Sequence, residues 1–364
     1  MTGRKRRWFT GLAALIIGAV LLVSGALPAE AAGSSVNRTL NGQTWTERDL
    51  SGSDRFKTAA QIAEAYAEIT GARPTEAILV YSHGFADALA ACSLAGHKRC
   101  PIIISKRNTL NADTKKLLTE TWQYSVKKVT MVGGGFEPAM INDLKSSCKV
   151  SVDTTTYAGA NRYETAEKVA GALYDAGIRT CAVATGWKPA DSLSMSSWSY
   201  AFRIPILFVD KAGNIAGGTN TLALARKFEH VYILGATGAV SAKTETDIDN
   251  YTGRLEARIG GANRWETSRL IAQNFLAHYA GKSGNYQGAV VARGANANFP
   301  DALVGGPLAG EQQAAVILVD TSGMENGFRL YVREGISNGY VKRLDFLGAA
   351  AQGAVRSNLI GQLS

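Results

Sequence analysis

The sequence predicts an α/β fold made of three tandem three-layer α/β/α modules with mainly parallel sheets. The first observation is a repeat: "SGSDRFKTAAQIAEAY" from Ser51 recurs as "AGANRYETAEKVAGAL" from Ala158 and as "GGANRWETSRLIAQNF" from Gly260. The second is that strand-like and helix-like segments alternate in each copy, and several of the strands are apolar throughout. A strand without a polar side is buried on both faces, so helices must cover both faces of its sheet. A copy of about 100 residues can bury a core of its own.

The first 31 residues have the pattern of a secretory signal peptide. Basic residues from Arg4 to Arg7 precede an apolar run from Gly11 to Val23, and small residues around Ala31 are typical of a cleavage site. A transmembrane anchor is the alternative, but the run is shorter than the roughly 20 residues that a membrane-spanning helix needs. We therefore expect a signal peptide at residues 1–31, for Sec or twin-arginine export, and a linker at residues 32–46 of the secreted protein.

The charge of the chain favours anionic partners. Removing residues 1–31, which hold four basic residues and one acidic residue, lowers the formal net charge from +9 to +6. A mildly basic secreted protein attracts anionic polymers or lipid head groups. The basic residues form no dense run, so we expect no nucleic-acid partner.

Each copy begins with an amphipathic helix. Four apolar residues per copy have offsets of 0, 6, 7 and 10, which place them on one helical face. These residues are Phe56, Ile62, Ala63 and Tyr66, then Tyr163, Val169, Ala170 and Leu173, then Trp265, Ile271, Ala272 and Phe275. The residues that precede the three helices are good N-caps: Asp54, Asn161 and Asn263.

The rest of each copy continues the alternation of strand and helix. An apolar strand and a turn lead to an aspartate that opens a second helix, and a buried-looking strand such as "PIIIS" from Pro101 follows. A third helix, a strand that ends in small residues and a fourth helix come next, and polar segments such as "CKVSVDTTTYAG" link the copies. We therefore place copy 1 at residues 47–150, copy 2 at residues 151–255 and copy 3 at residues 256–364, and expect no separate effector domain.

An arginine starts the first helix of every copy and an aspartate starts the second. Beside free backbone N–H groups, the arginine would suit a phosphate or carboxylate ligand. Parallel strands bring such loops together at the carboxyl end of a sheet, so we favour structural pairs between the arginine and the aspartate of the same copy. The predicted pairs are Arg55 with Asp87, Arg162 with Asp191, and Arg264 with Asp301. Three threonines are expected to help cap the first helices: Thr58, Thr165 and Thr267.

The four cysteines of the chain predict two disulfides, because exported proteins with an even number of cysteines commonly pair them. Four cysteines allow three connectivities, of which we favour Cys92 with Cys100 and Cys148 with Cys181. No CxxC or HxxxH pattern accompanies them, so we expect no metal site.

No motif for catalysis or for a cofactor occurs in the repeats. The glycines at 133–135 and 235–238 match neither GxxxxGK[ST] nor GxGxxG, and we interpret them as tight turns. His83 lies beside Ser82 and Asp87, but its counterpart in copy 2 is Trp187, and no GxSxG elbow is present. We therefore expect no cofactor and no catalytic residues.

Aromatic residues offer a second kind of ligand contact, since exposed rings can stack on sugars. They cluster in copy 2 at Trp187, Trp198 and Tyr200, and copy 3 has Tyr331 and Tyr340. Most aromatic residues in such a chain belong to its core, which is the favoured interpretation.

The repeated motifs resemble the type-two cell-wall-binding repeat of Gram-positive bacteria, which occurs as three tandem copies in S-layer and other surface proteins. The similarity lies in the "[DN]R[FYW]xT" helix start, in "GFADAL" with its relatives "PADSL" and "FPDAL", and in "PIII" and "PILF". The resemblance implies flavodoxin- or Toprim-like modules packed as a pseudo-trimer. It also implies non-covalent attachment to an anionic wall polymer, a secondary polysaccharide or a teichoic-type chain.

The resemblance further implies which residues bind the polymer. The Pro-Ile-Leu-Leu motif of the family corresponds to Pro101, Ile102, Ile103 and Ile104 in copy 1 and to Pro205, Ile206, Leu207 and Phe208 in copy 2. Copy 3 departs from the motif, because Ala315 replaces the proline.

We thus expect a secreted, non-catalytic protein of the cell wall or cell surface that binds an anionic polymer through three modules. An exported cell-wall hydrolase or amidase is one alternative. An adhesin that binds another cell is the other.

Overall fold

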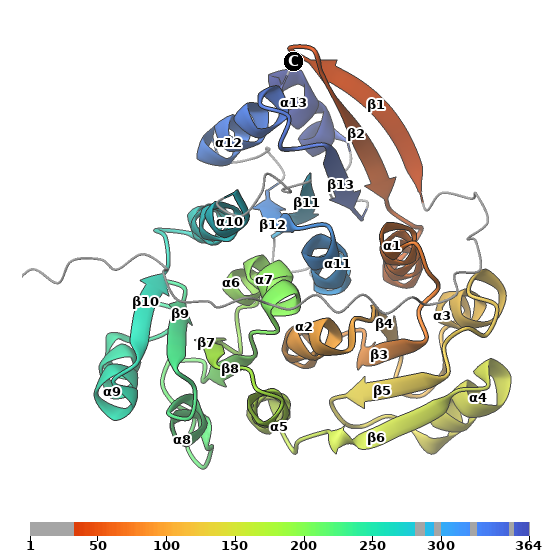
Figure 1. Ribbon diagram of the computed structural model, residues 1–364. Helices are drawn as coiled ribbons and strands as arrows, with labels where there is room; N and C mark the ends of the chain where they lie inside the picture. The colour runs from red at the N-terminus through yellow and green to blue at the C-terminus, as the bar shows by residue number, and fades with distance from the viewer. Residues whose placement is uncertain (1–32, 281–287, 295–299, 321–325, 349–352, 364) are drawn as a thin grey trace, which may run out of the picture.

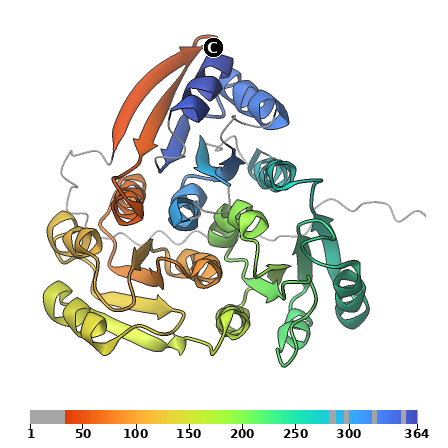
Figure 2. The same ribbon diagram turned by 180° about the vertical axis from the view of Figure 1, so that it is seen from behind.

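The structure, a computed structural model, describes residues 33–280, 288–294, 300–320, 326–348 and 353–363. Three α/β units surround a common centre (Figure 1), and the same arrangement is seen from behind (Figure 2). The predicted signal peptide at residues 1–31 lies outside the described residues. Among those described, no helix combines the length and the apolarity needed to cross a membrane.

Each copy alternates strands and helices as the sequence predicts. Copy 1 contains α1 (Arg55–Thr70), β3 (Glu76–Tyr81), α2 (Phe85–Lys98), β4 (Ile102–Ser105), α3 (Ala112–Lys116), the π-helix η1 (Leu117–Thr121), β5 (Lys128–Val132), α4 (Pro138–Cys148) and the following strand β6 (Ser151–Tyr157). Copy 2 contains α5 (Arg162–Asp175), β7 (Thr180–Thr185), α6 (Ala190–Ser194), α7 (Ser196–Phe202), β8 (Ile206–Val209), α8 (Thr221–Ala225), β9 (His230–Leu234), α9 (Ala242–Thr252) and β10 (Leu255–Ile259). Copy 3 contains α10 (Arg264–Ala280), β11 (Gly288–Arg293), α11 (Pro300–Glu311), β12 (Ala314–Val319), α12 (Asn326–Ser337), β13 (Arg343–Leu347) and α13 (Ala354–Leu363).

Three mainly parallel sheets confirm the predicted fold class. Their strand orders are β4-β3-β5-β6 in copy 1 and β8-β7-β9-β10 in copy 2, and the third sheet has the order β12-β11-β13-β2-β1. The first strand of each copy lies between the second and the third, so the chain crosses to opposite sides of it in turn. The loops at its carboxyl end therefore open a crevice, which is the usual ligand site of such sheets.

The predicted N-caps are confirmed. Each of the side chains Asp54, Asn161 and Asn263 accepts hydrogen bonds from two backbone N–H groups of the first helical turn. The three threonine hydroxyls accept hydrogen bonds from the chain that precedes each helix, and not from the helical turn itself. The hydroxyls of Thr58, Thr165 and Thr267 accept from the N–H groups of Gly52, Gly159 and Gly261, at 2.9, 3.2 and 2.9 Å, and so join each incoming strand to its helix.

The segment predicted as a linker, residues 32–46, instead contributes most of a β-hairpin, from residue 34 onward. Strand β1 (Ser34–Leu40) pairs antiparallel with β2 (Gln43–Leu50), and β2 pairs in parallel with β13 of copy 3. The backbone N–H of Gly348 donates to the Leu50 carbonyl at 3.0 Å. Gly133 and Gly235 make the same bond to Tyr157 and Ile259 at the ends of β6 and β10. Strand β2 therefore takes the place in the sheet of copy 3 that β6 and β10 take in the sheets of copies 1 and 2. In this way it closes the three copies into a ring.

The predicted boundaries of the copies need the same correction. Strand β6 lies within predicted copy 2 but pairs with β5 of copy 1. Strand β10 lies almost entirely within predicted copy 3 but pairs with β9 of copy 2. These outer strands are polar because they lie at sheet edges, which is why the sequence pattern indicated linkers.

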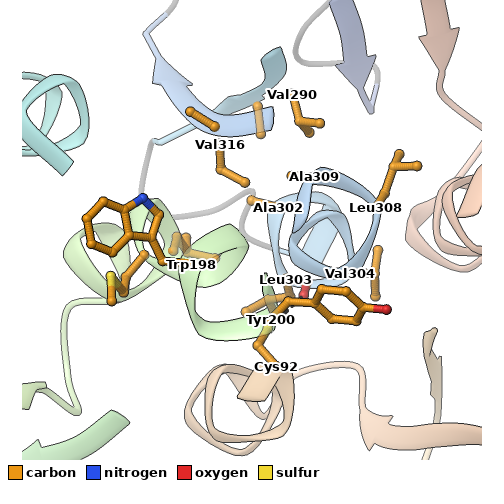
Figure 3. Close-up of a cluster of buried hydrophobic side chains, with 14 of the residues drawn as sticks. Cys92, Trp198, Tyr200, Val290, Ala302, Leu303, Val304, Leu308, Ala309 and Val316 are labelled. Atoms are coloured by element: carbon orange, nitrogen blue, oxygen red, sulfur yellow. Dashed lines mark hydrogen bonds between the residues drawn. The ribbon is translucent and has the colours of Figure 1, made fainter. Parts of the chain in front are cut away.

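Three helices, one from each copy, pack at the centre of the molecule: α2, α7 and α11 (Figure 3). Small residues allow the approach, since a Cβ added to Gly96 would lie 1.9 Å from the Tyr200 carbonyl oxygen. A chain of hydrogen bonds joins the three copies there. The Tyr66 and Tyr200 hydroxyls are 2.7 Å apart, and Tyr200 donates to Glu311 at 3.0 Å.

The predicted disulfides are not formed: Cys92, Cys100, Cys148 and Cys181 are free and buried. Cys148 lies in the hydrophobic cluster of copy 1 and Cys181 in that of copy 2, so the two side chains belong to separate cores. Cys92 lies in the central helix bundle, where its Sγ is 4.0 Å from the Leu303 carbonyl of copy 3. Burial raises the pKa of the Cys92 and Cys100 thiols to about 12 and that of Cys148 to about 11.

Candidate functional site

A cavity of about 430 Å³ lies between copy 1 and copy 2, at the carboxyl ends of β3 and β5. Its walls come from the loop between β3 and α2, from the turn after β5, from Arg107 after β4, and from the start of α5. Helices α2 and α5 pack against each other, as Figure 1 shows, so their amino-terminal ends converge on this space. The cavity is therefore the crevice that the strand order predicts.

Asp87 forms one wall of the cavity and faces copy 2. The Thr165 hydroxyl hydrogen-bonds to its carboxylate, and Arg107 and Arg162 are its charged neighbours. Burial raises the pKa of Asp87, and the two arginines and Thr165 act in the opposite direction. Gly133 makes room for this carboxylate, because a Cβ there would lie 2.3 Å from Oδ2 of Asp87.

The same arrangement recurs at the other two junctions between copies. Asp191 hydrogen-bonds with Thr267 and faces Arg264, and Asp301 faces Arg55. Burial raises the pKa of both aspartates to about 6, and the facing arginine lowers it in part. We name these sites junction 1–2 (Asp87, Gly133, Arg162, Thr165), junction 2–3 (Asp191, Gly235, Arg264, Thr267) and junction 3–1 (Asp301, Gly348, Arg55).

The predicted pairs between arginine and aspartate of the same copy are therefore wrong in their partners. Arg55, Arg162 and Arg264 face the aspartate of the preceding copy in the ring, and not Asp87, Asp191 and Asp301 of their own copies. Each arginine donates to a backbone carbonyl of its own copy instead: Arg55 to Ser82 at 3.3 Å, Arg162 to Gly186, and Arg264 to Gly294 at 2.6 Å. The reason is topological, because the helix that carries the arginine packs beside the second helix of the copy before it. Each arginine thus connects two copies.

Arg107 gives the cavity of junction 1–2 a second guanidinium group. It lies 4.4 Å from the centre of the Tyr81 ring, and its Nε is buried without a hydrogen-bond partner among the described residues. Gly135 permits this position, because a Cβ there would lie 2.6 Å from Nη1 of Arg107. Gly84, which precedes α2, caps that helix without a side-chain hydrogen bond. The cavity thus combines cationic side chains with the positive end of a helix, which suits an anion.

Ser82 and His83 do not form a catalytic arrangement in the described residues. The Ser82 Oγ is 3.0 Å from His83 Nδ1, but the serine is buried, and no described carboxylate is hydrogen-bonded to the imidazole. Burial and the nearby Arg55 lower the pKa of His83. Within the same described ranges, no group of three His, Cys, Asp or Glu side chains is placed to hold a metal ion.

The residues assigned to polymer binding by the Pro-Ile-Leu-Leu motif lie in the core, which corrects that assignment. The motif residues form β4 and β8 with the preceding prolines, and all eight are buried: Pro101, Ile102, Ile103, Ile104, Pro205, Ile206, Leu207 and Phe208. Helices pack against these strands, so the side chains contribute to the core. Their apolar character throughout was the signal that favoured a core role.

The molecule is thus a repeat protein, a ring of three α/β modules with polar sites between the modules. The chain belongs to the family of cell wall binding domain 2 (CWB2), which matches residues 49–136, 156–245 and 258–344. Domains of this family bind cell-wall polymers, and the three matches coincide with the three repeats.

Two curated relatives come from Bacillus subtilis (strain 168). The chain is 26% identical to the N-acetylmuramoyl-L-alanine amidase LytC over 325 residues, which cover 89% of this chain and 57% of that protein. It is 24% identical to an amidase enhancer over 305 residues, which cover 83% of this chain and 38% of that protein. The chain therefore spans a little more than half the length of LytC and less than half the length of the amidase enhancer.

Two solved structures from Clostridium difficile have the same fold. Cwp8 has a TM-score of 0.69 and 25% identity, and the match covers 87% of this chain and 51% of that one. Cwp6 has a TM-score of 0.69 and 20% identity, and the match covers 95% of this chain and 51% of that one. At 20% identity, the similarity to Cwp6 shows a shared fold and nothing further.

Proposed function

We propose that this protein is secreted and attaches non-covalently to the cell wall, and that it binds an anionic wall polymer at the junctions between its copies. The main support for this proposal is the cavity of junction 1–2. Arg107 and Arg162 face a single carboxylate there, that of Asp87, so the cavity keeps an excess of positive charge. Phosphate and carboxylate groups form strong charge-assisted hydrogen bonds with guanidinium groups.

The repetition of the junction supports binding to a polymer. An aspartate, a strand-end glycine and an arginine of the next copy recur at all three junctions. A polymer that repeats its charge can engage several linked sites at once, which raises the overall affinity by about 10²–10⁴ over one site. This arrangement needs no catalytic group, and we propose a binding role without catalysis.

The similarity to the amidase LytC does not extend an amidase activity to this chain. The chain spans 57% of the amidase LytC, and the matched part consists of repeats that belong to a binding family. Ser82 is a buried neighbour of His83 and is not one of the residues that line the cavity. A hydrolytic role therefore has no support in the described residues.

Co-sedimentation with isolated cell walls tests the proposal. Purified protein is mixed with walls before and after acid extraction of their anionic polymers, over a series of salt concentrations. We expect binding that is lost on extraction and weakened by salt, since salt screens exposed charges. Failure of the protein to bind untreated walls would contradict the proposed function.

Arg107→Ala tests the cavity itself. Hydrogen bonds to charged groups contribute about 1.5–3 kcal/mol, so we expect the dissociation constant for walls to rise about ten- to hundredfold. Arg179→Ala is the matched control, because Arg179 also stacks on a tyrosine, at 4.6 Å from the Tyr174 ring centre, but precedes β7 at the opposite end of its sheet. Equal losses in the two variants would show that positive charge in general, and not the cavity, binds the wall.

A further inference from the structure

We propose that Trp187 is a stacking platform for a sugar ring, so that the ligand is a glycan built from rings and not a flexible chain of polyol phosphates. This inference rests on the proposed function and specifies the chemical class of the ligand. Trp187 lies in the loop between β7 and α6 of copy 2, and 45% of its surface is exposed. Tryptophan is enriched at interfaces, because it combines a large apolar ring with a polar N–H group.

The indole of Trp187 is held in a fixed position. Its Nε1 donates a hydrogen bond to the Tyr163 hydroxyl at 2.9 Å. The guanidinium carbon of Arg162 lies 4.3 Å from the ring centre and covers one face. Arg162 thus stacks on one face of the indole, while the side chain keeps 45% of its surface exposed. A fixed ring loses little conformational entropy when a ligand packs on it, which favours binding.

Arg162 places this platform next to the cavity of junction 1–2. Its guanidinium carbon lies 5.4 Å from the ring centre of Phe85, and Phe85 and Arg162 both line the cavity. The same guanidinium stacks on Trp187 and donates to the Gly186 carbonyl. A ligand in the cavity thus needs only to extend past Arg162 to reach the indole.

The two surfaces together match one kind of ligand. The cavity suits an anionic substituent, because Arg107 and Arg162 both face it. The flat indole suits the apolar C–H face of a pyranose ring. A polyol phosphate chain would satisfy the arginines but has no flat apolar face for Trp187. The ligand that uses both surfaces is an acidic or phosphate-bearing polysaccharide.

Binding to isolated walls tests the role of the ring with a series of variants. We expect Trp187→Ala to weaken binding roughly three- to tenfold, the range of stacking contacts, and Trp187→Phe to restore most of it. Tyr163→Phe removes the hydrogen bond but leaves the Arg162 stack, so it should weaken binding less than Trp187→Ala does. Tyr251→Ala is the matched control, because Tyr251 is 44% exposed and is stacked by Arg226 at 5.1 Å, on α9 of the same copy.

Competition with soluble polymers tests the ligand. An acidic pyranose polysaccharide should displace the unaltered protein from walls, and should do so less effectively with Trp187→Ala, whereas poly(glycerol phosphate), which has no sugar ring, should compete equally with both proteins. Thermal unfolding of each variant shows whether the fold is intact. Full binding by Trp187→Ala, a loss in Trp187→Phe as large as in Trp187→Ala, or equal competition by the pyranose polysaccharide against the unaltered protein and Trp187→Ala would overturn the inference. If the unaltered protein does not bind untreated walls at all, the proposed function itself has failed.

Discussion

At the scale of single residues, the repeated motif is explained by contacts between copies. Buried aspartates such as Asp191 and Asp301 are costly, because burial disfavours a charged carboxylate. A facing arginine offsets part of this cost at each junction. The glycine that follows the third strand has positive φ, for example +95° at Gly235, and leaves space for the carboxylate. Aspartate, glycine and arginine thus recur together because each requires the others.

The raised pKa of Asp191 predicts a pH dependence of stability. Its folded-state pKa of about 6 lies above the ordinary value of 3.8. The folded state therefore binds the proton more tightly, and the free energy of unfolding should fall as the pH rises from about 4 through 6. Asp191→Asn removes this contribution. The difference in free energy of unfolding, unaltered protein minus Asp191→Asn, should decrease by about 1–3 kcal/mol between pH 4.5 and pH 7.5.

Chemical denaturation at several pH values measures this difference. Asp175→Asn is the control, since Asp175 is an exposed carboxylate in α5. A pH-independent difference for Asp191→Asn would show that Asp191 keeps an ordinary acidity in the folded protein.

At the scale of elements, the sites form where strand ends meet helix starts. Strand β5 ends at Val132, and the chain turns at Gly133 with φ of +87° before it enters α4. The turn lets Asp87 approach the backbone, and Gly135 lets Arg107 approach it. The shape of the cavity therefore depends on a glycine turn between two elements more than on either element itself.

Gly133→Ala tests the importance of this turn. A side chain at positive φ is strained, and its Cβ would meet the Asp87 carboxylate, so we expect a loss of about 1–3 kcal/mol in the free energy of unfolding. Wall binding should weaken as well, because Asp87 and the cavity wall must shift. Gly171→Ala in α5 is the control: a Cβ there meets nothing within 4 Å, and alanine in a helix interior should stabilise by about 0.5–1 kcal/mol. Similar effects of the two substitutions would contradict the account.

At the scale of the whole molecule, the N-terminal hairpin closes the ring of copies. Strand β2 completes the sheet of copy 3, and α1, which follows it, packs against α11 of that copy. Arg48 on β2 donates to the buried Asp345 on β13 at 2.8 Å, and Gln312 donates to the same carboxylate at 2.6 Å. Junction 3–1 therefore depends on residues from both ends of the chain.

Arg48→Ala should open the ring. The substitution leaves the fully buried Asp345 without its guanidinium partner, which costs about 3–5 kcal/mol. We expect amide hydrogens of β2 and β13 to exchange faster, while those of β3 and β5 keep their protection. Arg38→Ala is the control, since Arg38 is 40% exposed and its buried partner Glu47 would keep a second guanidinium, that of Arg356. Uniform loss of protection over all three sheets would indicate one cooperative unit instead of a closure that opens locally.

Much of the fold could be predicted because it follows from local patterns. The offsets of Phe56, Ile62 and Tyr66 define a helical face, and the three N-caps come directly before their helices. The unbroken apolar character of "PIIIS" indicates a doubly covered strand. The hairpin at residues 34–50 could not be predicted, because its partner strand β13 lies at the far end of the chain and its outer strand is polar.

The sequence by itself determined the number of modules, their α/β class, their helix starts and their membership of a binding family. Only the tertiary structure decided which aspartate faces which arginine, that the Pro-Ile-Leu-Leu strands are buried in their modules, and that Trp187 lies close to a cavity. The physical reason is the range of the interactions. Helix caps and apolar periodicity act within a few residues, whereas charge pairing and cavity walls depend on how whole copies pack against each other.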